Sequence, residues 1–377
     1  MMLVRENGHA CDRVPASYRL GTYRRVAPRQ TLATILPVVA DCGVTRLADV
    51  TGLDRIGIPV FQAVRPMAKS LSVSQGKGVT RNAARVSALM EAIELHCAEN
   101  AVPDGFGLAP AADPEGPGEG WCTGTDLLSG QISRVAHRRV SMDYTDLAMA
   151  AASNSNGLAS GNDRAEAVVA ALCEVIERDA HSHWAARPIS LRERTAIDPS
   201  TIADPVGLRL LRSIRAAGLG FRLWSFGDDH GVAAIACAVY ELTSDLGLIL
   251  PPTMGAGAHL EPAVALARAV TEAVQIRATL IAGARDDLTA RDYAAPEVLR
   301  LRFLIEGGGT VTPTLPWTAL RSRSTGCLLR DGELLMAAAA RAGAKRIDCI
   351  DLGGPDLPVS VVKLLVPDFL GHAERPA

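Results

Sequence analysis

Apolar residues recur at helical spacing in three long segments, and each segment is predicted to form a helix. The three helices are expected at about residues 81–99, 164–184 and 262–282. They contain ALMEAIEL at 88–95, ALCEVIER at 171–178 and TEAVQIR at 271–277. In each of them an acid is followed three residues later by a second polar acceptor, so the two side chains share one helical face.

These acidic pairs recur in a similar apolar frame. The pairs are Glu91 with Glu94, Glu174 with Glu177 and, as a more distant echo, Glu272 with Gln275. A single pair of this kind is usually a solvated helix face, but the recurrence favours side chains that converge on one point. Like charges held close together cost free energy unless a cation or a basic group compensates them. The repeat therefore predicts a cation or a basic group near these helices.

Basic residues close to the same helices fit a Mg²⁺–triphosphate site. Lys77, Arg178 and Arg268 would neutralise phosphate oxygens, and Mg²⁺ is usually shared between a few carboxylates and substrate phosphates. A flexible Gly-containing loop is predicted before each helix, where backbone N–H groups can approach an anion. The loops are SQGKGVT at 74–80, SNSNGLASGND at 153–163 and MGAGAHLEP at 254–262. The GKG at 76–78 is followed by Val79, so it is not a P-loop, and no dinucleotide-binding fingerprint occurs.

Three other residues near the helices are interpreted as packing residues. Cys97 and Cys173 lie inside the first two helices, where neighbouring carboxylates would raise the pKa of a thiol and make it a poor nucleophile. His259 precedes the third helix and is interpreted as a cap or packing residue, with a catalytic role as the alternative.

Shorter patterns predict further elements and loops. We expect a helix at 31–42, extended segments within 59–73, a Pro- and Gly-rich surface loop at 103–120, a hairpin at 127–135 that turns at Ser129–Gly130, and a second hairpin around GDDHG at 227–231. Three acidic helices in similar settings suggest structural repetition within one α/β domain.

Composition narrows the class of protein. The chain has 377 residues, 48% of them hydrophobic and 21% charged, which fits a globular enzyme-sized protein. A net charge of −2 gives no global basic field for nucleic acid. No apolar run is long enough for a membrane span, no secretory signal is recognised, and no zinc-ligand spacing occurs. The eight scattered cysteines are expected to be reduced, mostly buried thiols of a cytoplasmic protein.

Three longer motifs together resemble the YcaO family. They are SQGKGVTRNAARVSALMEAIE at 74–94, SNGLASGNDRAEAVVAALCEVIERDA at 155–180 and GAGAHLEPAVALARAVTEAVQIRATLIAGARDD at 255–287. The resemblance covers about residues 60–370. It implies an α/β (α+β) fold of the YcaO type, which binds ATP without a P-loop and repeats units of helix and antiparallel sheet. Residues 1–60 are expected to pack as an N-terminal segment on a catalytic domain at 61–377.

The resemblance also implies the chemistry. Members of the family use ATP and Mg²⁺ to activate a backbone amide of a peptide. A nucleophile attacks the carbonyl carbon, the oxyanion takes the γ-phosphoryl group of ATP, and phosphate leaves. A side-chain thiol or hydroxyl then gives an azoline, sulfide gives a thioamide and an amine gives an amidine. The protein supplies positioning and charge neutralisation, which agrees with the lack of a recognisable Ser/His/Asp or Cys/His arrangement.

Matching the motifs residue by residue transfers roles to this chain. Glu91, Glu174, Glu177 and Glu272 are expected to share Mg²⁺ ions. Lys77, Arg178 and Arg268 are expected to contact phosphates and to act in catalysis. Glu94, Asn162, Glu166, Gln275 and Arg285 are further candidates for nucleotide or metal binding.

Two departures from the family pattern shape the expected product. Leu95 stands where the first acidic helix usually has Arg, so any ion pair of that Arg is missing or is made by another residue. The chain also ends LLVPDFLGHAERPA instead of with the Pro-rich tail of azoline-forming members. This favours a thioamide-forming enzyme with a TfuA-like partner, a peptide or protein substrate recognised through a separate protein, and a homodimer. An azoline-forming cyclodehydratase and a non-catalytic accessory factor for methylthiolation of a ribosomal protein remain the alternatives.

Overall fold

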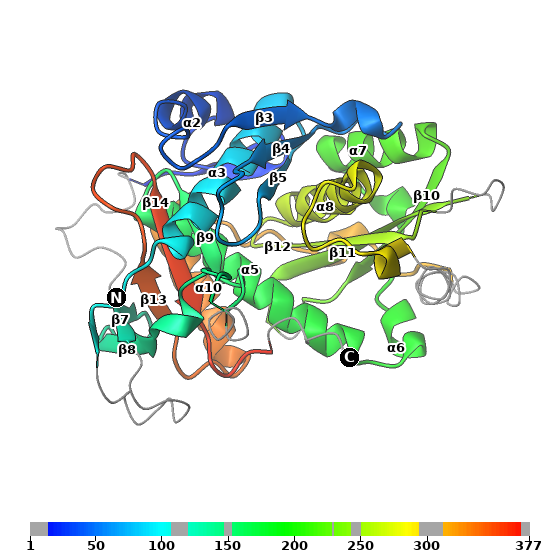
Figure 1. Ribbon diagram of the computed structural model, residues 1–377. Helices are drawn as coiled ribbons and strands as arrows, with labels where there is room; N and C mark the ends of the chain where they lie inside the picture. Colours follow the sequence, from blue (N-terminus) through cyan, green and yellow to red (C-terminus); the bar gives the residue numbers. More distant parts are fainter. Residues whose placement is uncertain are drawn as a thin grey trace.

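Each of the three acidic helices follows directly from a β-strand (Figure 1). The pairs are β5 (Val73–Lys77) with α3 (Arg81–Glu99), β9 (Leu158–Gly161) with α5 (Arg164–Ala185), and β12 (Thr253–His259) with α8 (Pro262–Ala282). Each helix packs back on the strand that precedes it. The computed structural model describes residues 14–106, 120–146, 153–227, 230–242, 250–293 and 312–370.

Local sequence signals explain where these helices begin and end. The Thr80 side chain accepts a hydrogen bond from the Ala83 N–H (3.2 Å), and Asp163 accepts one from Glu166 (2.9 Å), so both are N-caps. Helix α8 starts with Pro262 at its first position, where the missing N–H costs nothing. It ends at Gly283, whose φ of 57° terminates the helix. The three predicted helices are thus confirmed within one or two residues.

The glycines before the helices have a different role from the one predicted. SQGKGVT, SNSNGLASGND and MGAGAHLEP each contribute a strand, so the expectation of three flexible loops is wrong. A Cβ added to Gly76 would lie 2.1 Å from the backbone oxygen of Ala84, and one added to Gly255 would lie 2.3 Å from the backbone nitrogen of Ala273. These glycines therefore allow β5 and β12 to approach the backbones of α3 and α8.

Three antiparallel sheets carry the helices. One has the order β3 (Arg46–Asp49), β4 (Val60–Val64), β5, and another has β10 (Leu219–Ser225), β11 (Ala233–Glu241), β12. The largest has the order β6 (Gly105–Phe106), β7 (Gly120–Asp126), β13 (Asp348–Asp351), β14 (Ser360–Leu365), β9, with β8 (Ile132–Ala136) on β7. In Figure 1, the acidic helices lie between β13–β14 on one side and β10–β11 on the other. The predicted mixed α/β class with antiparallel sheet units is confirmed.

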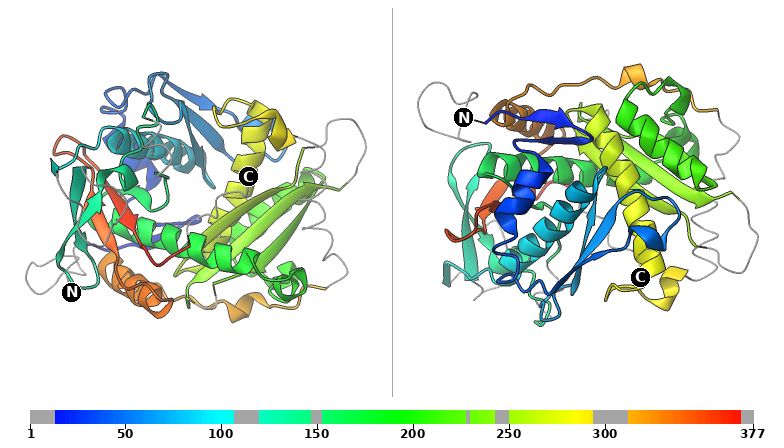
Figure 2. Two further views of the ribbon diagram at one scale, coloured as in Figure 1. Left: turned by 60° about the horizontal axis from the view of Figure 1, so that its bottom comes forward. Right: turned by 90° about the horizontal axis from the view of Figure 1, so that it is seen from above.

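Strand β11 shows how the helices are joined into one core. Its alternate residues Ala234, Ala236 and Ala238 belong to the same apolar cluster as α5. Ile235, Cys237 and Val239 belong instead to the cluster that contains the buried residues of α8. Because side chains alternate between the two faces of a strand, the β10–β11–β12 sheet is covered by α5 on one face and by α8 on the other (Figure 2).

The shorter predictions have mixed outcomes. Both hairpins are present as β7–β8, with a φ of 74° at Gly130, and as β10–β11. Residues 107–119 of the predicted surface loop lie outside the described residues. The helix predicted at 31–42 is α2 (Pro28–Ile35), which begins earlier because Pro28 suits the first helical turn. The remaining elements are β1 (Ser17–Arg19), β2 (Thr22–Arg24), α6 (Ile189–Glu193), α7 (Pro205–Ala216) and α10 (Leu328–Arg341).

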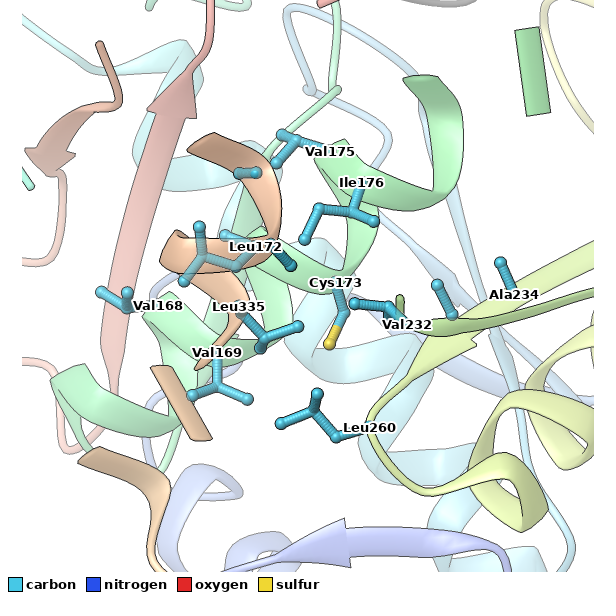
Figure 3. Close-up of a cluster of buried hydrophobic side chains, with 14 of the residues drawn as sticks. Val168, Val169, Leu172, Cys173, Val175, Ile176, Val232, Ala234, Leu260 and Leu335 are labelled. Atoms are coloured by element: carbon cyan, nitrogen blue, oxygen red, sulfur yellow. The ribbon is translucent and has the colours of Figure 1, made fainter. Parts of the chain in front are cut away.

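The cysteines are mostly packing residues. Cys173 is 1% exposed and lies among the apolar side chains that α5, α10 and the β10–β11 region bring together (Figure 3). Cys97 is likewise buried, and six cysteines in the described ranges are free thiols. Cys327 is disulfide-bonded, so the expectation of reduced thiols is wrong for this residue. Within the described ranges, every helix is too short or too polar to span a lipid bilayer.

Candidate functional site

A cavity of about 290 Å³ opens between α3, α5, α8 and residues 21–31 of the N-terminal segment. Seven of the twelve residues predicted to act at the site line it: Lys77, Glu91, Glu94, Asn162, Glu166, Glu174 and Arg268. They come from all three strand–helix units. The periodicity that predicts three helices therefore also locates one shared site.

Ion pairs connect three more predicted residues to this lining. Glu174 lies 3.0 Å from Arg178 one turn along α5, and Lys77 at the end of β5 donates a hydrogen bond to Glu272 on α8. Glu177 lies 3.7 Å from Arg268 on α8. Acids and bases thus lie next to one another at and beside the cavity, so that phosphate groups would meet cations and a metal ion would meet carboxylates.

Burial makes the carboxyl groups of α3 poor anions when no ligand is present. It raises the pKa of Glu91 to about 7, although Arg285 and Lys77 oppose this rise. Burial also raises the pKa of Glu94 to about 8. The hydrogen bond that Ser160 Oγ donates to Glu94 (2.5 Å) opposes this rise, and repulsion from Glu91 adds to it. A cation bound between them would favour the ionised forms.

The carboxylates near Arg268 have closer basic partners than the two carboxyl groups of α3 that line the cavity. Burial raises the pKa of Glu177, and Arg268 opposes this effect. The Ala258 N–H of β12 also donates to Glu177 (2.9 Å). Burial would also raise the pKa of Glu272, but the charge of Lys77 holds it below its ordinary value. In the described residues, Nε of Arg268 is buried without a hydrogen-bond partner. That donor is available to an anionic ligand.

Asn162 and Glu166 hold the N-terminal segment over the cavity. Glu166 accepts hydrogen bonds from Nη1 of Arg24 (3.1 Å), the backbone N–H of Arg25 (2.9 Å) and Nδ2 of Asn162 (2.8 Å). Asn162 in turn accepts one from Thr31 (2.8 Å). Sequence reasoning missed Arg24 and Thr31, since no local pattern relates them to residues more than 130 positions away.

The last two predicted residues lie outside the cavity lining. Gln275 donates to Gln75 at 3.4 Å. Arg285 pairs with Asp287 (2.8 Å), yet its charge also acts on Glu91. Leu95 is buried in the apolar cluster of α3. Arg285 therefore supplies positive charge near Glu91 where Leu95 replaces the arginine of the family pattern.

His259 was interpreted as a packing residue, yet it also lines the cavity. Its ring centroid lies 5.2 Å from that of Tyr23, and its Nδ1 accepts the Glu261 N–H (2.9 Å). One sequence signal could have placed it there. His259 directly follows GAGA at the end of β12, just before α8 begins.

The residues present fit a nucleotide-bound Mg²⁺ ion. No three His, Cys, Asp or Glu side chains in the described ranges are close enough to hold a metal ion by themselves. The carboxylates Glu174, Glu177 and Glu272 are instead bonded to arginine or lysine. Mg²⁺ takes oxygen ligands and commonly completes its shell with phosphate oxygens and water. A site with carboxylate oxygens, nearby cations and an unpaired Arg268 donor matches this requirement.

Comparisons with known proteins identify the family of this chain. The family model described as YcaO cyclodehydratase, ATP- and Mg²⁺-binding, matches residues 110–370. An uncharacterized protein of the tfuA 3′ region of Rhizobium leguminosarum bv. trifolii is 33% identical, over 91% of this chain and 88% of that protein.

Solved structures match the fold of this chain. The YcaO protein of Methanopyrus kandleri bound with AMPPCP and Mg²⁺ has 26% identity and a TM-score of 0.76, with 94% of each chain covered. A heterocyclase in complex with substrate and cofactor shares the fold, with a TM-score of 0.72 at 20% identity over 96% of this chain and 55% of that one. The chain therefore belongs to the YcaO family, whose cofactors are ATP and Mg²⁺.

Proposed function

We propose that this chain binds Mg²⁺–ATP in the cavity between α3, α5 and α8 and uses it to install a thioamide in the backbone of a peptide or protein. A TfuA-like partner would supply the sulfide. The observation that carries the proposal is the convergence of carboxylates and cations from three strand–helix units on one cavity. The tfuA-region relative supports the choice of partner.

The residues of the chain would divide the work by charge. Glu91, Glu174, Glu177 and Glu272 would ligate Mg²⁺. The last three would exchange their present contacts with lysine and arginine for the metal. Lys77, Arg178 and Arg268 would then be free to bind phosphate oxygens. Glu94, Asn162 and Glu166 would hold the nucleotide or the metal, with Gln275 and Arg285 placed just outside them.

The chemistry requires positioning more than a protein nucleophile. When bound, ATP supplies the phosphoryl group that turns the amide oxygen into a leaving group. Sulfide forms the new carbon–sulfur bond, and the carbon–oxygen bond breaks as phosphate departs. Arg268 and Lys77 would neutralise the charge that develops on the phosphate oxygens. The free cysteines of the described residues are buried and take no part.

Mass spectrometry of co-produced peptides tests the proposal. The full chain is produced with a TfuA-type protein and candidate substrate peptides, and the peptides are examined for replacement of one oxygen by sulfur. Glu174→Gln is the matched control, because it removes one proposed metal ligand while keeping the side-chain shape. We expect ATP- and sulfide-dependent modification with the native chain and none with the variant.

Other outcomes would identify a different member of the family. Loss of one water from the peptide, without a need for sulfide, would indicate an azoline-forming enzyme, the activity named in the family description. Binding of Mg²⁺–AMPPCP without ATP hydrolysis or any change in mass would indicate an accessory protein. Either result would overturn the thioamide proposal.

A further inference from the structure

His259 presents an uncharged hydrogen-bond donor to the cavity. The Glu261 N–H donates to Nδ1 (2.9 Å), so Nδ1 must be unprotonated and the ring proton must sit on Nε2. The side chain is 7% exposed and lines the cavity. Among the described residues, none accepts a hydrogen bond from Nε2. Because His259 lines the cavity and no described residue accepts this proton, the Nε2–H group is available to a ligand atom.

The surroundings of His259 keep it neutral and fixed. Burial, together with the nearby charges of Arg268 and Arg24, lowers its pKa to about 3. The ring of Tyr23 packs at 5.2 Å from the imidazole, and Gly326 N–H holds the Tyr23 hydroxyl (2.7 Å). His259 is thus held between a fixed ring and a backbone hydrogen bond. The imidazole is therefore neutral at neutral pH, and its Nε2–H acts as a hydrogen-bond donor.

The charges beside His259 identify the kind of ligand atom. Arg24 and Arg268 line the same cavity and act on His259 electrostatically, and Arg268 retains an unpaired Nε donor. We propose that Nε2–H of His259 binds a phosphate oxygen of the nucleotide next to the guanidinium of Arg268. This inference rests on the proposed function, since it requires that the nucleotide occupies this cavity. It makes His259 a binding and positioning residue, with no role as an acid or a base.

Two variants separate the donor from the packing of the ring. His259→Phe keeps an aromatic ring against Tyr23 and removes the donor, whereas His259→Gln keeps an N–H group near the position of Nε2. Calorimetry measures the affinities for Mg²⁺–AMPPCP and for adenosine, which lacks phosphates. We expect His259→Phe to weaken Mg²⁺–AMPPCP binding at least about tenfold, as for a hydrogen bond to a charged group, and His259→Gln to retain most of the affinity. Adenosine binding should change in neither variant.

Selective ¹⁵N labelling of histidine tests the native protein directly, even if a variant fails to fold. We expect the Nε2–H tautomer from pH 6 to 8, with an Nε2 resonance that shifts on addition of Mg²⁺–AMPPCP and not of adenosine. Equal affinity of His259→Phe and native protein for Mg²⁺–AMPPCP, or an equal loss for adenosine, would overturn the assignment. If native protein binds no Mg²⁺–AMPPCP at all, the proposed function fails instead. If Glu174→Gln abolishes binding while His259→Phe does not affect it, only the role of His259 is wrong.

Discussion

Arg268 on α8 lies 3.7 Å from Glu177 on α5, measured between Nη2 and Oε2. Glu177 is also bonded to β12 through Ala258, so this one carboxylate connects two of the three strand–helix units. Burial would lower the pKa of Arg268, but the charges of Glu177 and other nearby acids raise it above its ordinary value. The guanidinium is therefore charged, partly paired and directed at the cavity. A bound phosphate would compete with Glu177 for it.

Arg268→Gln should therefore weaken nucleotide binding more than it weakens the fold. The variant removes a charged donor to phosphate, and hydrogen bonds to charged groups contribute enough to predict at least about a tenfold loss of Mg²⁺–AMPPCP affinity. The affinity of Arg268→Lys should lie between those of the native protein and Arg268→Gln, because lysine keeps the charge but lacks the planar guanidinium group. Calorimetric titration measures all three proteins.

Arg209 provides the matched control for that experiment. It is exposed on α7 and does not line the cavity, so Arg209→Gln removes the same charge at a site remote from the nucleotide. Its affinity for Mg²⁺–AMPPCP should equal that of the native protein. If Arg209→Gln and Arg268→Gln reduce affinity equally, a loss of general positive charge explains the effect and the phosphate contact is wrong.

The ligand-free protein should become less stable as the pH rises, in part because of Glu94. Burial raises the pKa of Glu94 from 4.5 to about 8 in the folded chain. Between these values the folded state holds a proton that the unfolded state has lost, so the free energy of unfolding falls with pH. One such group contributes a slope of up to about 1.4 kcal/mol per pH unit. Urea unfolding at pH 5 to 8 measures it.

Glu94→Gln isolates that contribution, because the amide does not titrate and can still accept the hydrogen bond from Ser160. The free energy of unfolding of the variant should decrease less steeply between pH 5 and 8 than that of native protein. Parallel curves would show that Glu94 is ionised throughout this range in the folded protein. The predicted desolvation of the α3 carboxyl would then be wrong.

The three acidic helices were predictable because each buries one continuous apolar stripe and starts and ends at recognisable residues such as Thr80 and Gly283. The convergence of their acids was predictable for a similar reason. A repeated frame such as ALMEAIEL and ALCEVIER directs the same face of each helix toward the core. Local periodicity therefore reports both the elements and the face that carries the site.

Features that depend on distant parts of the chain were not predictable in this way. The strand β5 reads VSQGK instead of alternating apolar and polar residues, because its Gly76 serves close packing on α3. The contacts of Arg24 with Glu166 and of His259 with Tyr23 join residues that no sequence period relates. The roles of these residues emerge only once the N-terminal segment is placed over the cavity.

Gly76→Ala should destabilise the protein strongly, although the substitution is small. The added Cβ would lie 2.1 Å from both the Ala84 oxygen and the Ala88 nitrogen, and these backbone atoms can move only if α3 moves. We expect a loss of about 3 kcal/mol or more, at the upper end for overpacking. Gly52→Ala is the control, since no atom lies within 4 Å of its added Cβ. Its free energy of unfolding should stay within about 0.5 kcal/mol of native, and a similar small effect for Gly76→Ala would refute the packing role.

Restoring the arginine of the family pattern at position 95 should harm this protein. Leu95 is 4% exposed within the apolar cluster of α3, β4 and neighbouring segments, so Leu95→Arg would bury a charge with no partner provided for it. We expect a loss of about 3 kcal/mol or more in the free energy of unfolding, whereas the volume-conserving Leu95→Met should cost less than about 1.5 kcal/mol. Chemical denaturation of both variants measures the difference. A stable Leu95→Arg protein with higher Mg²⁺–AMPPCP affinity would show instead that this position still faces the site, and that Arg285 does not replace the missing arginine beside Glu91.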